Sequence, residues 1–115
     1  MRNSKNKERC EKLSLSKCAG VCRTYSDLQM AYAKQLEADE EIVEFQCNVP
    51  LTGFEMDDGA YTTDFVCTTK HGDVFVRECV RRSLIERPKK IKLLDASREY
   101  WAQHGVMDWG LVIDV

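Results

Sequence analysis

The sequence predicts a single α/β domain with a mixed central sheet flanked by helices, in the element order αβββαβ. Within residues 61–82, apolar and polar residues alternate with a period of two on both sides of Lys70–Asp73, which is typical of two half-buried antiparallel strands. Apolar residues recur at helical spacing before this hairpin, over 28–36, and after it, over 91–101. A continuous apolar run over 109–115 favours a last, central strand buried on both faces.

Composition places the chain among ordinary globular domains. It has 115 residues, of which 43% are hydrophobic and 31% charged, and this length can bury one core. No apolar run approaches the roughly 18 residues that a membrane span needs. The basic N-terminus is not followed by a hydrophobic stretch, so we expect no secretory signal. We therefore expect a cytoplasmic protein whose cysteines are thiols.

Charge is segregated along the chain, although the net charge is only −2. Residues 1–23 are rich in Lys and Arg, 27–64 are acidic with Lys34 as the one basic residue, and basic residues return over 77–92. Two basic blocks around an acidic middle would suit a phosphate backbone approaching a metal centre. Charges that only solvate the surface are the alternative interpretation.

Residues 1–25 are predicted to be a basic, flexible arm, with a short helix around Lys7–Leu13. Cys18 and Cys22 have the C-x₃-C spacing found in zinc sites, but such sites need further ligands. The other cysteines of the domain stand singly on predicted strands, so free thiols are favoured over a structural zinc; these are Cys47, Cys67 and Cys79.

The predicted domain, 26–115, begins with a helix. Ser26 and Gln29 have the form of a capping box, and the acidic run Asp39–Glu41 ends the helix. Alternation over 43–49 then predicts a strand that Pro50 stops, and 51–60 is a predicted loop.

The hairpin strands each carry one acid, Asp64 on the first and Glu78 on the second. Glu78 alternates with valines, and a carboxylate on an apolar face is costly unless it is paired or metal-bound. Two carboxylates on adjacent strands can hold Mg²⁺, which prefers oxygen ligands.

The second helix is predicted to begin at Pro88 and to end at His104 and Gly105. His71 lies in a predicted turn and His104 at a helix end, so neither is a catalytic candidate. Cys79 has no evident histidine partner and is expected to be a buried thiol.

This order of elements, with an Asp on the second strand and an acid on the third, resembles the core of PD-(D/E)xK nucleases. Within that superfamily the chain is similar to the N-terminal catalytic domain of TnsA, a transposon endonuclease subunit. The likeness covers about Ser26 to Val115 and implies a restriction-endonuclease-like αβββαβ core. Its short features, in chain order, are Ser26-x-Leu28, the acidic run before Ile42-Val43, Val49-Pro50-Leu51, Tyr61-Thr-Thr-Asp64-Phe65, Ser97-x-x-Tyr100-Trp101, Gly105 and Trp109.

The resemblance assigns roles by position. The helix carboxylate of the family falls on Gln29, the strand acids fall on Asp64 and Glu78, and the motif lysine falls on Val80. It implies that Asp64 and Glu78 bind Mg²⁺, that Gln29 belongs to the catalytic set, and that DNA is cut in concert with a transposase partner. Homo-oligomers are also expected. The residues expected to contact nucleic acid are Arg77, Arg81, Arg82, Lys89 and Lys90.

Two departures from the family pattern define two hypotheses. Gln29 adds no charge, and Val80 cannot orient a water, a loss that typically costs about 10²–10⁴-fold in rate. Rescue would come from Arg82, Lys89 or Lys90, with a lysine favoured because arginine stays protonated. The first hypothesis is a metal-dependent endonuclease subunit of a mobile element. The second is an inactive nuclease fold that binds DNA or protein for a transposon, plasmid or phage, or inhibits a host defence complex.

Structural roles are the alternative for each candidate. Gln29 would complete the capping box, Asp64 would be a turn partner at a strand edge, and Glu78 would form a buried ion pair with an arginine. The arginines and lysines of 81–90 would be solvated charges.

Overall fold

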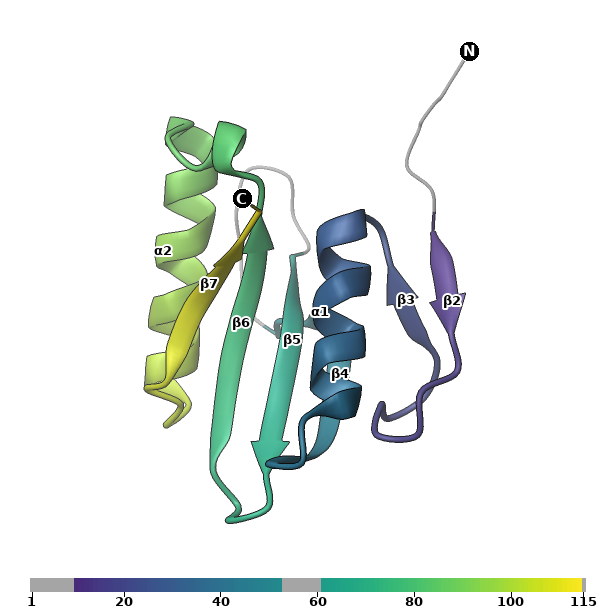
Figure 1. The fold of residues 1–115 in the computed structure, drawn as a ribbon. Coiled ribbons are helices and arrows are strands. Elements are labelled where there is room, and N and C mark those ends of the chain that lie inside the picture. The colour runs from purple at the N-terminus through teal and green to yellow at the C-terminus, as the bar shows by residue number, and fades with distance from the viewer. Residues whose placement is uncertain (1–9, 53–60, 115) are drawn as a thin grey trace.

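The protein is described by a computed structural model, which covers residues 10–52 and 61–114. Two helices, one short 3₁₀ helix and six strands lie within these ranges (Figure 1). In chain order they are β2 (Glu11–Leu13), β3 (Cys22–Thr24), α1 (Asp27–Ala38), β4 (Ile42–Pro50), β5 (Thr62–Thr69), β6 (Val74–Val80), η1 (Arg82–Leu84), α2 (Pro88–Gln103) and β7 (Trp109–Ile113).

The main sheet has four strands in the order β4-β5-β6-β7. β4, β5 and β6 form an antiparallel meander, and β7 pairs with β6 in parallel after the crossover through α2. β5 and β6 are joined at Lys70–Asp73, where Gly72 has a φ of 87°, a left-handed conformation that glycine adopts without strain. The prediction of an α/β protein with a mixed sheet is confirmed.

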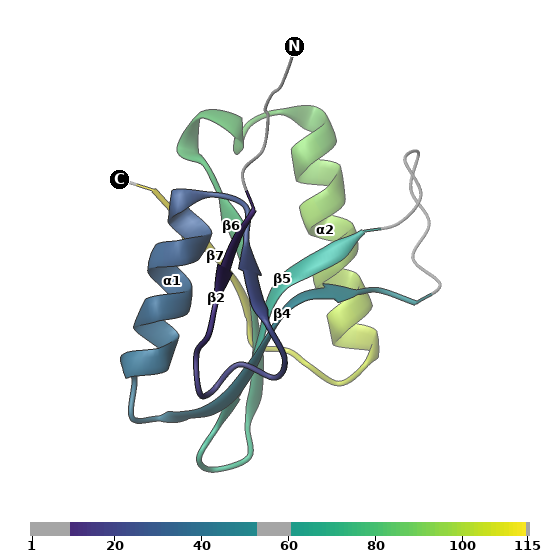
Figure 2. The same ribbon diagram turned by 90° about the vertical axis from the view of Figure 1, so that its right-hand side faces the viewer.

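The two helices cover opposite faces of this sheet (Figure 2). On the α1 face, the ring of Tyr32 packs edge-on against Phe65 of β5, with ring centroids 5.3 Å apart. On the other face, Ser97 of α2 donates a hydrogen bond to Glu78 of β6. Where β5 and β6 are paired, side chains of adjacent residues alternate between faces, so Phe65 faces α1 and Glu78 faces α2.

Most of the buried apolar side chains lie between the sheet and α1. Phe45 and Phe65, from β4 and β5, are fully buried there and pack against Ala33 and Leu36 of α1. Because about 1.5–3 kcal/mol is gained for each large apolar side chain buried, this layer fixes the position of α1 on the sheet.

Both helix starts match the sequence patterns. The Ser26 hydroxyl accepts a hydrogen bond from the backbone N–H of Gln29, and Pro88 occupies the first turn of α2. α2 ends at His104, followed by Gly105 with a φ of 85°.

The predicted flexible arm is wrong for residues 10–25. This part of the chain forms the antiparallel hairpin β2–β3 beside the main sheet (Figure 1), and Glu11–Leu13 is strand where a short helix was expected. Cys18 and Cys22 join the buried core, which the polar composition of the segment concealed. The remainder of the expected arm lies outside the described residues.

The predicted last strand is present as β7, but its predicted position in the centre of the sheet is wrong. β7 pairs only with β6 among the described strands and is therefore an edge strand, and its residues are half-buried or exposed. Its continuous apolar run reflects contacts with α1 on one face and α2 on the other rather than a central position. No helix in the described ranges is long and apolar enough to span a membrane.

Candidate functional site

Asp64 and Glu78 meet where β5 and β6 separate. The last paired position of the two strands at this end is Phe65 opposite Arg77, so Asp64 and Glu78 lie one residue beyond it. Beyond this position, hydrogen bonds to the two carboxylate side chains take the place of backbone-to-backbone hydrogen bonds between the strands. Glu78 Oε1 accepts from the Asp64 N–H at 3.0 Å, and Asp64 Oδ2 accepts from the Cys79 N–H at 2.7 Å. The two carboxylates thus bridge the gap between diverging strands.

Glu78 lies at the centre of a polar network beneath α2. It is 1% exposed, and it is the one buried Asp or Glu in the described parts of the chain. Its Oε2 accepts from the Ser97 hydroxyl at 2.6 Å, and Ser97 Oγ in turn accepts from Trp109 Nε1 at 3.2 Å. The Tyr61 side chain also hydrogen bonds with Glu78. The donors to Glu78 are hydroxyls and a backbone N–H, so no arginine ion pair is seen in the described structure.

Gln29 joins α1 to this pair. Its side-chain Oε1 accepts from the Tyr25 N–H at 2.7 Å, while its Nε2 donates to Asp64 Oδ1 at 3.0 Å. The amide therefore stabilises the start of the helix and orients Asp64 at once. The sequence presented helix capping and contact with the carboxylate pair as alternatives for Gln29. In the structure the one side chain makes both contacts.

Burial sets the protonation of the pair. It raises the pKa of Asp64 to about 6, against the lowering effect of the Cys79 N–H, the Lys90 charge and the Gln29 amide. Burial and the nearby Asp64 charge raise the pKa of Glu78 to about 7. These are the shifts expected of two carboxylates that share a partly dry volume without a cation.

The donor set fits Mg²⁺. Each of the four carboxylate oxygens of Asp64 and Glu78 accepts a hydrogen bond, from Gln29, Cys79, Asp64 and Ser97. Tyr61 and Thr63 also hydrogen bond with Glu78. Each Asp64 oxygen has a second lone pair, so coordination by Asp64 does not require its bonds to break. Hard oxygen ligands completed by waters suit Mg²⁺, and its charge would offset the repulsion within the pair.

Val80 occupies the position at which the resemblance expects a lysine, and Lys90 lies near the carboxylate pair. Val80 is 3% exposed, on the same side of β6 as Glu78, so it packs in the interior. Lys90, in the first turn of α2, is close enough for its charge to lower the pKa of Asp64. The charge of Lys90 therefore acts on Asp64.

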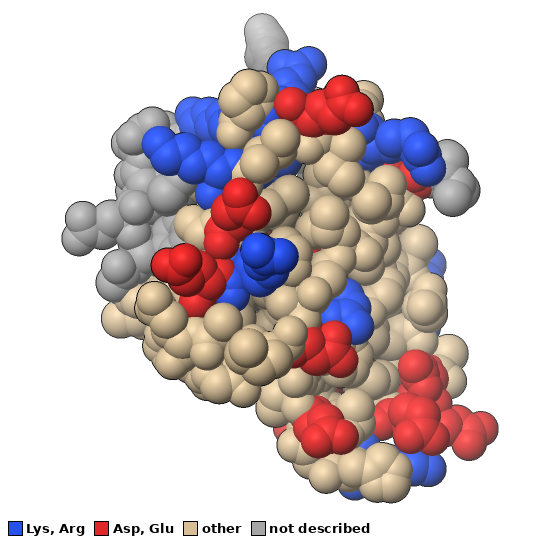
Figure 3. All heavy atoms as spheres, turned by 90° about the vertical axis from the view of Figure 1, so that its left-hand side faces the viewer, with Lys and Arg blue, Asp and Glu red and all other residues tan. Residues whose placement is uncertain are grey.

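Basic residues gather at the same end of the molecule. The starts of α1, β5 and α2 and the ends of β6 and β7 lie together at the upper end of Figure 1. Lys and Arg side chains cluster over this end in the space-filling view (Figure 3). Arg81, Arg82 and Lys89 are exposed there, at η1 and the start of α2, and Lys90 is half-buried.

Arg77 does not belong to this cluster. It points to the opposite face of β6 from Glu78, where its guanidinium lies 4.7 Å from the Phe75 ring centroid and 3.0 Å from Asp108 Oδ1. The contact with Asp108 fixes Arg77 between β6 and the start of β7, away from the carboxylate pair.

The surroundings of Cys79 do not activate its thiol as a nucleophile. Burial raises the pKa of its thiol, as do the charges of Asp64 and Glu78. A thiol held protonated in this way is a poor nucleophile. Of the two histidines, His71 lies in the β5–β6 turn and His104 caps α2, as the sequence indicated.

Sequence reasoning missed the hydroxyl and indole groups that support the acids. Ser97, Thr63 and Tyr61 all hydrogen bond with Glu78, and Trp101 Nε1 donates to Thr63 Oγ1 at 2.8 Å. Ser97 and Trp101 are four residues apart, which places them on one face of α2. That spacing was the available signal, but it does not show which strand residues the helix faces.

No protein-family model matches the chain, and no curated protein sequence matches it either.

Proposed function

We propose that the protein is a metal-dependent DNA endonuclease subunit of the TnsA-like type, with a PD-(D/E)xK core, acting beside a transposase. The observation that carries the proposal is the pairing of Asp64 with Glu78 where β5 and β6 separate, at the end of the molecule to which Lys90 and the basic residues belong. The element sequence from α1 to β7 runs α, three strands, α, strand, as that core requires.

In the proposed reaction each group has one role. Asp64 and Glu78 hold Mg²⁺, which supplies Lewis-acid stabilisation of a phosphodiester and a water of lowered pKa. Gln29 keeps Asp64 in place through its amide. Lys90 replaces the motif amine by offsetting charge beside Asp64, and the starts of α1 and α2 add the positive ends of two helix dipoles.

A second function is supported by Val80. Its burial leaves the motif position without any polar group, and a protein of this kind could keep a metal or DNA site without cutting. In that case the chain is an accessory factor that binds DNA or protein. The two functions share the fold and differ in the outcome of one experiment.

The test is titration of Mg²⁺ and Mn²⁺ into the purified protein by calorimetry, followed by incubation with supercoiled plasmid DNA. The endonuclease hypothesis predicts metal binding and nicking or linearisation. Asp64→Asn and Glu78→Gln should lose both, because each isosteric change removes a charged ligand and retains the side-chain volume.

Lys90 and Lys92, both in α2, give a matched control for the amine. Lys90→Ala should lower cleavage by about 10²-fold or more while metal binding persists, whereas Lys92→Ala should leave cleavage unchanged because Lys92 is exposed farther along α2. Metal binding without cleavage, also in the presence of a transposase, would support the accessory factor. Absence of metal binding by the wild type at millimolar concentration would refute the endonuclease proposal.

A further inference from the structure

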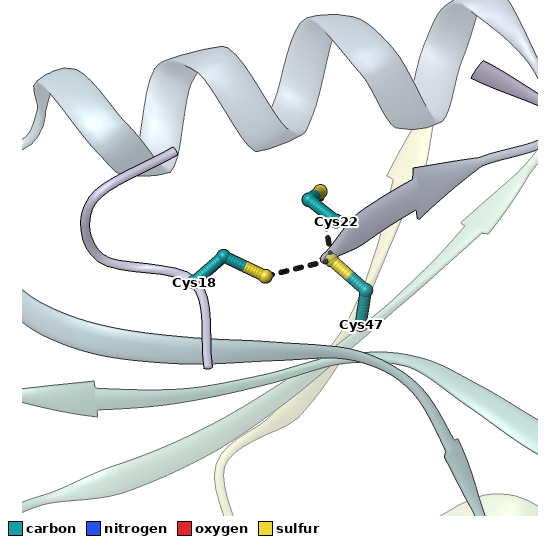
Figure 4. A group of neighbouring side chains, drawn as sticks. All are labelled: Cys18, Cys22 and Cys47. Carbon is teal, nitrogen blue, oxygen red and sulfur yellow. Dashed lines mark hydrogen bonds between the residues drawn. The ribbon is translucent and has the colours of Figure 1, made fainter. Parts of the chain in front are cut away.

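Three cysteines from different parts of the chain meet on the α1 side of the sheet. Cys18 comes from the loop after β2, Cys22 from the start of β3, and Cys47 from β4 (Figure 4). The Cys47 sulfur lies 2.9 Å from that of Cys22 and 3.7 Å from that of Cys18, and all three sulfurs lie within 4.8 Å of one another. Cys47 therefore supplies the further ligand that the C-x₃-C pair lacks in the sequence.

The backbone holds this cluster in place without help from the thiols. The loop of Cys18 is bonded to β4 on both sides, since the Phe45 N–H donates to Lys17 O and the Ala19 N–H donates to Phe45 O, each at 2.9 Å. Asn48, next to Cys47, donates its side-chain amide to the carbonyl of Arg23, next to Cys22, at 2.7 Å. Each cysteine is thus positioned by a hydrogen bond of a neighbouring residue, as a preformed metal site requires.

A carboxylate of α1 fastens the same loop from the other side. Glu37 accepts from the Ser16 hydroxyl at 2.6 Å and from the Lys17 N–H at 3.0 Å. The loop is therefore clamped between α1 and β4 just before Cys18.

The sulfur spacing fits a tetrahedral ion. With Zn–S bonds of about 2.3 Å, tetrahedral geometry places two sulfurs about 3.8 Å apart. The distance from Cys18 to Cys47 already has this value, and the Cys22 sulfur has to move by less than about 1 Å. Three thiolates are soft ligands that favour Zn²⁺ over Mg²⁺ or Ca²⁺.

We propose that Cys18, Cys22 and Cys47 bind one Zn²⁺ ion, with a water molecule as the fourth ligand. Cys47 is half-buried, so the site is open to solvent at that residue. The ion fastens the β2–β3 hairpin to β4, and its three protein ligands do not include Asp64 or Glu78. It is independent of the proposed nuclease function.

The experiment measures zinc in protein purified with a thiol reductant and without chelator. Elemental analysis should give one zinc per chain for the wild type. Cobalt added to the demetallated protein should produce sulfur-to-cobalt charge-transfer absorption in the near ultraviolet and the visible bands of tetrahedral Co²⁺. Cys22→Ser and Cys47→Ser should weaken zinc binding by more than the roughly 10–100-fold that loss of an outer-shell partner costs.

Cys67→Ser is the matched control, because Cys67 is a fully buried thiol on β5 outside the cluster. It should keep one zinc per chain, as should Asp64→Asn, which tests the alternative that the ion sits at the carboxylates. If the cluster variants fail to fold, the wild type still tests the proposal. Removal of zinc should lower the melting temperature of the wild type, and re-addition of zinc should restore it.

Wild-type protein that carries no zinc and gives no charge-transfer absorption with cobalt would overturn the proposal. So would a Cys22–Cys47 disulfide, seen as a mass two hydrogens lower under non-reducing conditions, because a disulfide leaves only one thiol for the metal.

Discussion

Glu78 shows at the scale of one residue why the carboxylate pair favours binding of a proton or a cation. It is buried, it faces Asp64, and its bonds come from neutral donors. Neutral hydrogen bonds orient a carboxylate but do not offset its charge as a metal ion does. Protonation or metal binding are the two ways to relieve the repulsion.

Stability should therefore depend on pH in a defined direction. The folded pKa of Glu78, about 7, exceeds its ordinary value of 4.5, so the folded chain binds the proton more tightly than the unfolded chain. This contribution is present below about pH 4.5 and is lost as the pH rises through about 7. In chelator, the free energy of unfolding should fall between about pH 5 and 8, by up to roughly 3 kcal/mol from this residue.

Urea unfolding followed by circular dichroism measures this effect. Glu78→Gln should show a shallower decline with pH than the wild type, and Glu44→Gln, an exposed acid on β4, should match the wild type. Mg²⁺ at about pH 8 should restore stability to the wild type but not to Glu78→Gln. Equal slopes for Glu78→Gln and the wild type would show that the pair does not govern the pH dependence.

At the scale of elements, the first turn of α1 couples the helix to the strands. Gln29 accepts a bond from Tyr25 and donates one to Asp64, so a change in this turn reaches the carboxylate pair. Ser26 holds the same turn through its hydroxyl but does not contact Asp64 in the described structure.

Gln29→Glu should therefore make the stability of the protein depend more strongly on bound Mg²⁺. The new carboxylate replaces a donor to Asp64 with a third negative group, so the metal-free variant should be less stable than the wild type, and its Mg²⁺ affinity should be higher because three acids face the ion. Calorimetry and thermal unfolding with and without Mg²⁺ measure both effects.

Ser26→Ala is the control for this turn. It should cost about 1 kcal/mol of stability through loss of the N-cap and leave the Mg²⁺ affinity unchanged. A Gln29→Glu variant that binds Mg²⁺ no more tightly than the wild type would show that the ion does not lie beside α1.

At the scale of the whole molecule, exposed basic side chains lie at the end of the fold that contains the carboxylate pair. The strand and helix directions bring the starts of both helices to one end, and the basic residues of η1 and of the first turn of α2 are at that end (Figures 1 and 3). A phosphate backbone approaching there would meet positive side chains before the carboxylate pair.

DNA binding should depend on these charges in a salt-dependent way. Combined neutralisation of Arg81, Arg82 and Lys89 should weaken binding. It should also reduce the slope of log K against log salt by about one for each phosphate that the protein no longer neutralises. Fluorescence anisotropy with a labelled duplex at several salt concentrations measures the slope.

A control with the same change in charge is available elsewhere on the surface. Lys12, Lys34 and Arg98 are exposed on β2, α1 and α2. Their neutralisation should leave the slope nearly unchanged; an equal loss in both triple variants would indicate only a response to net charge.

Much of the fold and part of the site could be predicted from local patterns. The capping box fixed the start of α1, Pro88 the start of α2, and alternation the β5–β6 hairpin. The same alternation placed Glu78 among buried valines, which identified it as a candidate. These features depend on residues close together in the chain, so their physical causes are visible in the sequence.

The sequence by itself determined the helices and strands from α1 to β7, the β5–β6 hairpin, and Asp64 and Glu78 as candidate residues. Only the tertiary structure decided that β7 is an edge strand, that residues 10–25 pack on the core, and that Cys47 meets Cys18 and Cys22. It also decided that Arg77 turns away from the site and that Ser97 supports Glu78. These outcomes depend on how strands are ordered and which faces the helices cover, and such long-range packing leaves no local periodicity in the chain.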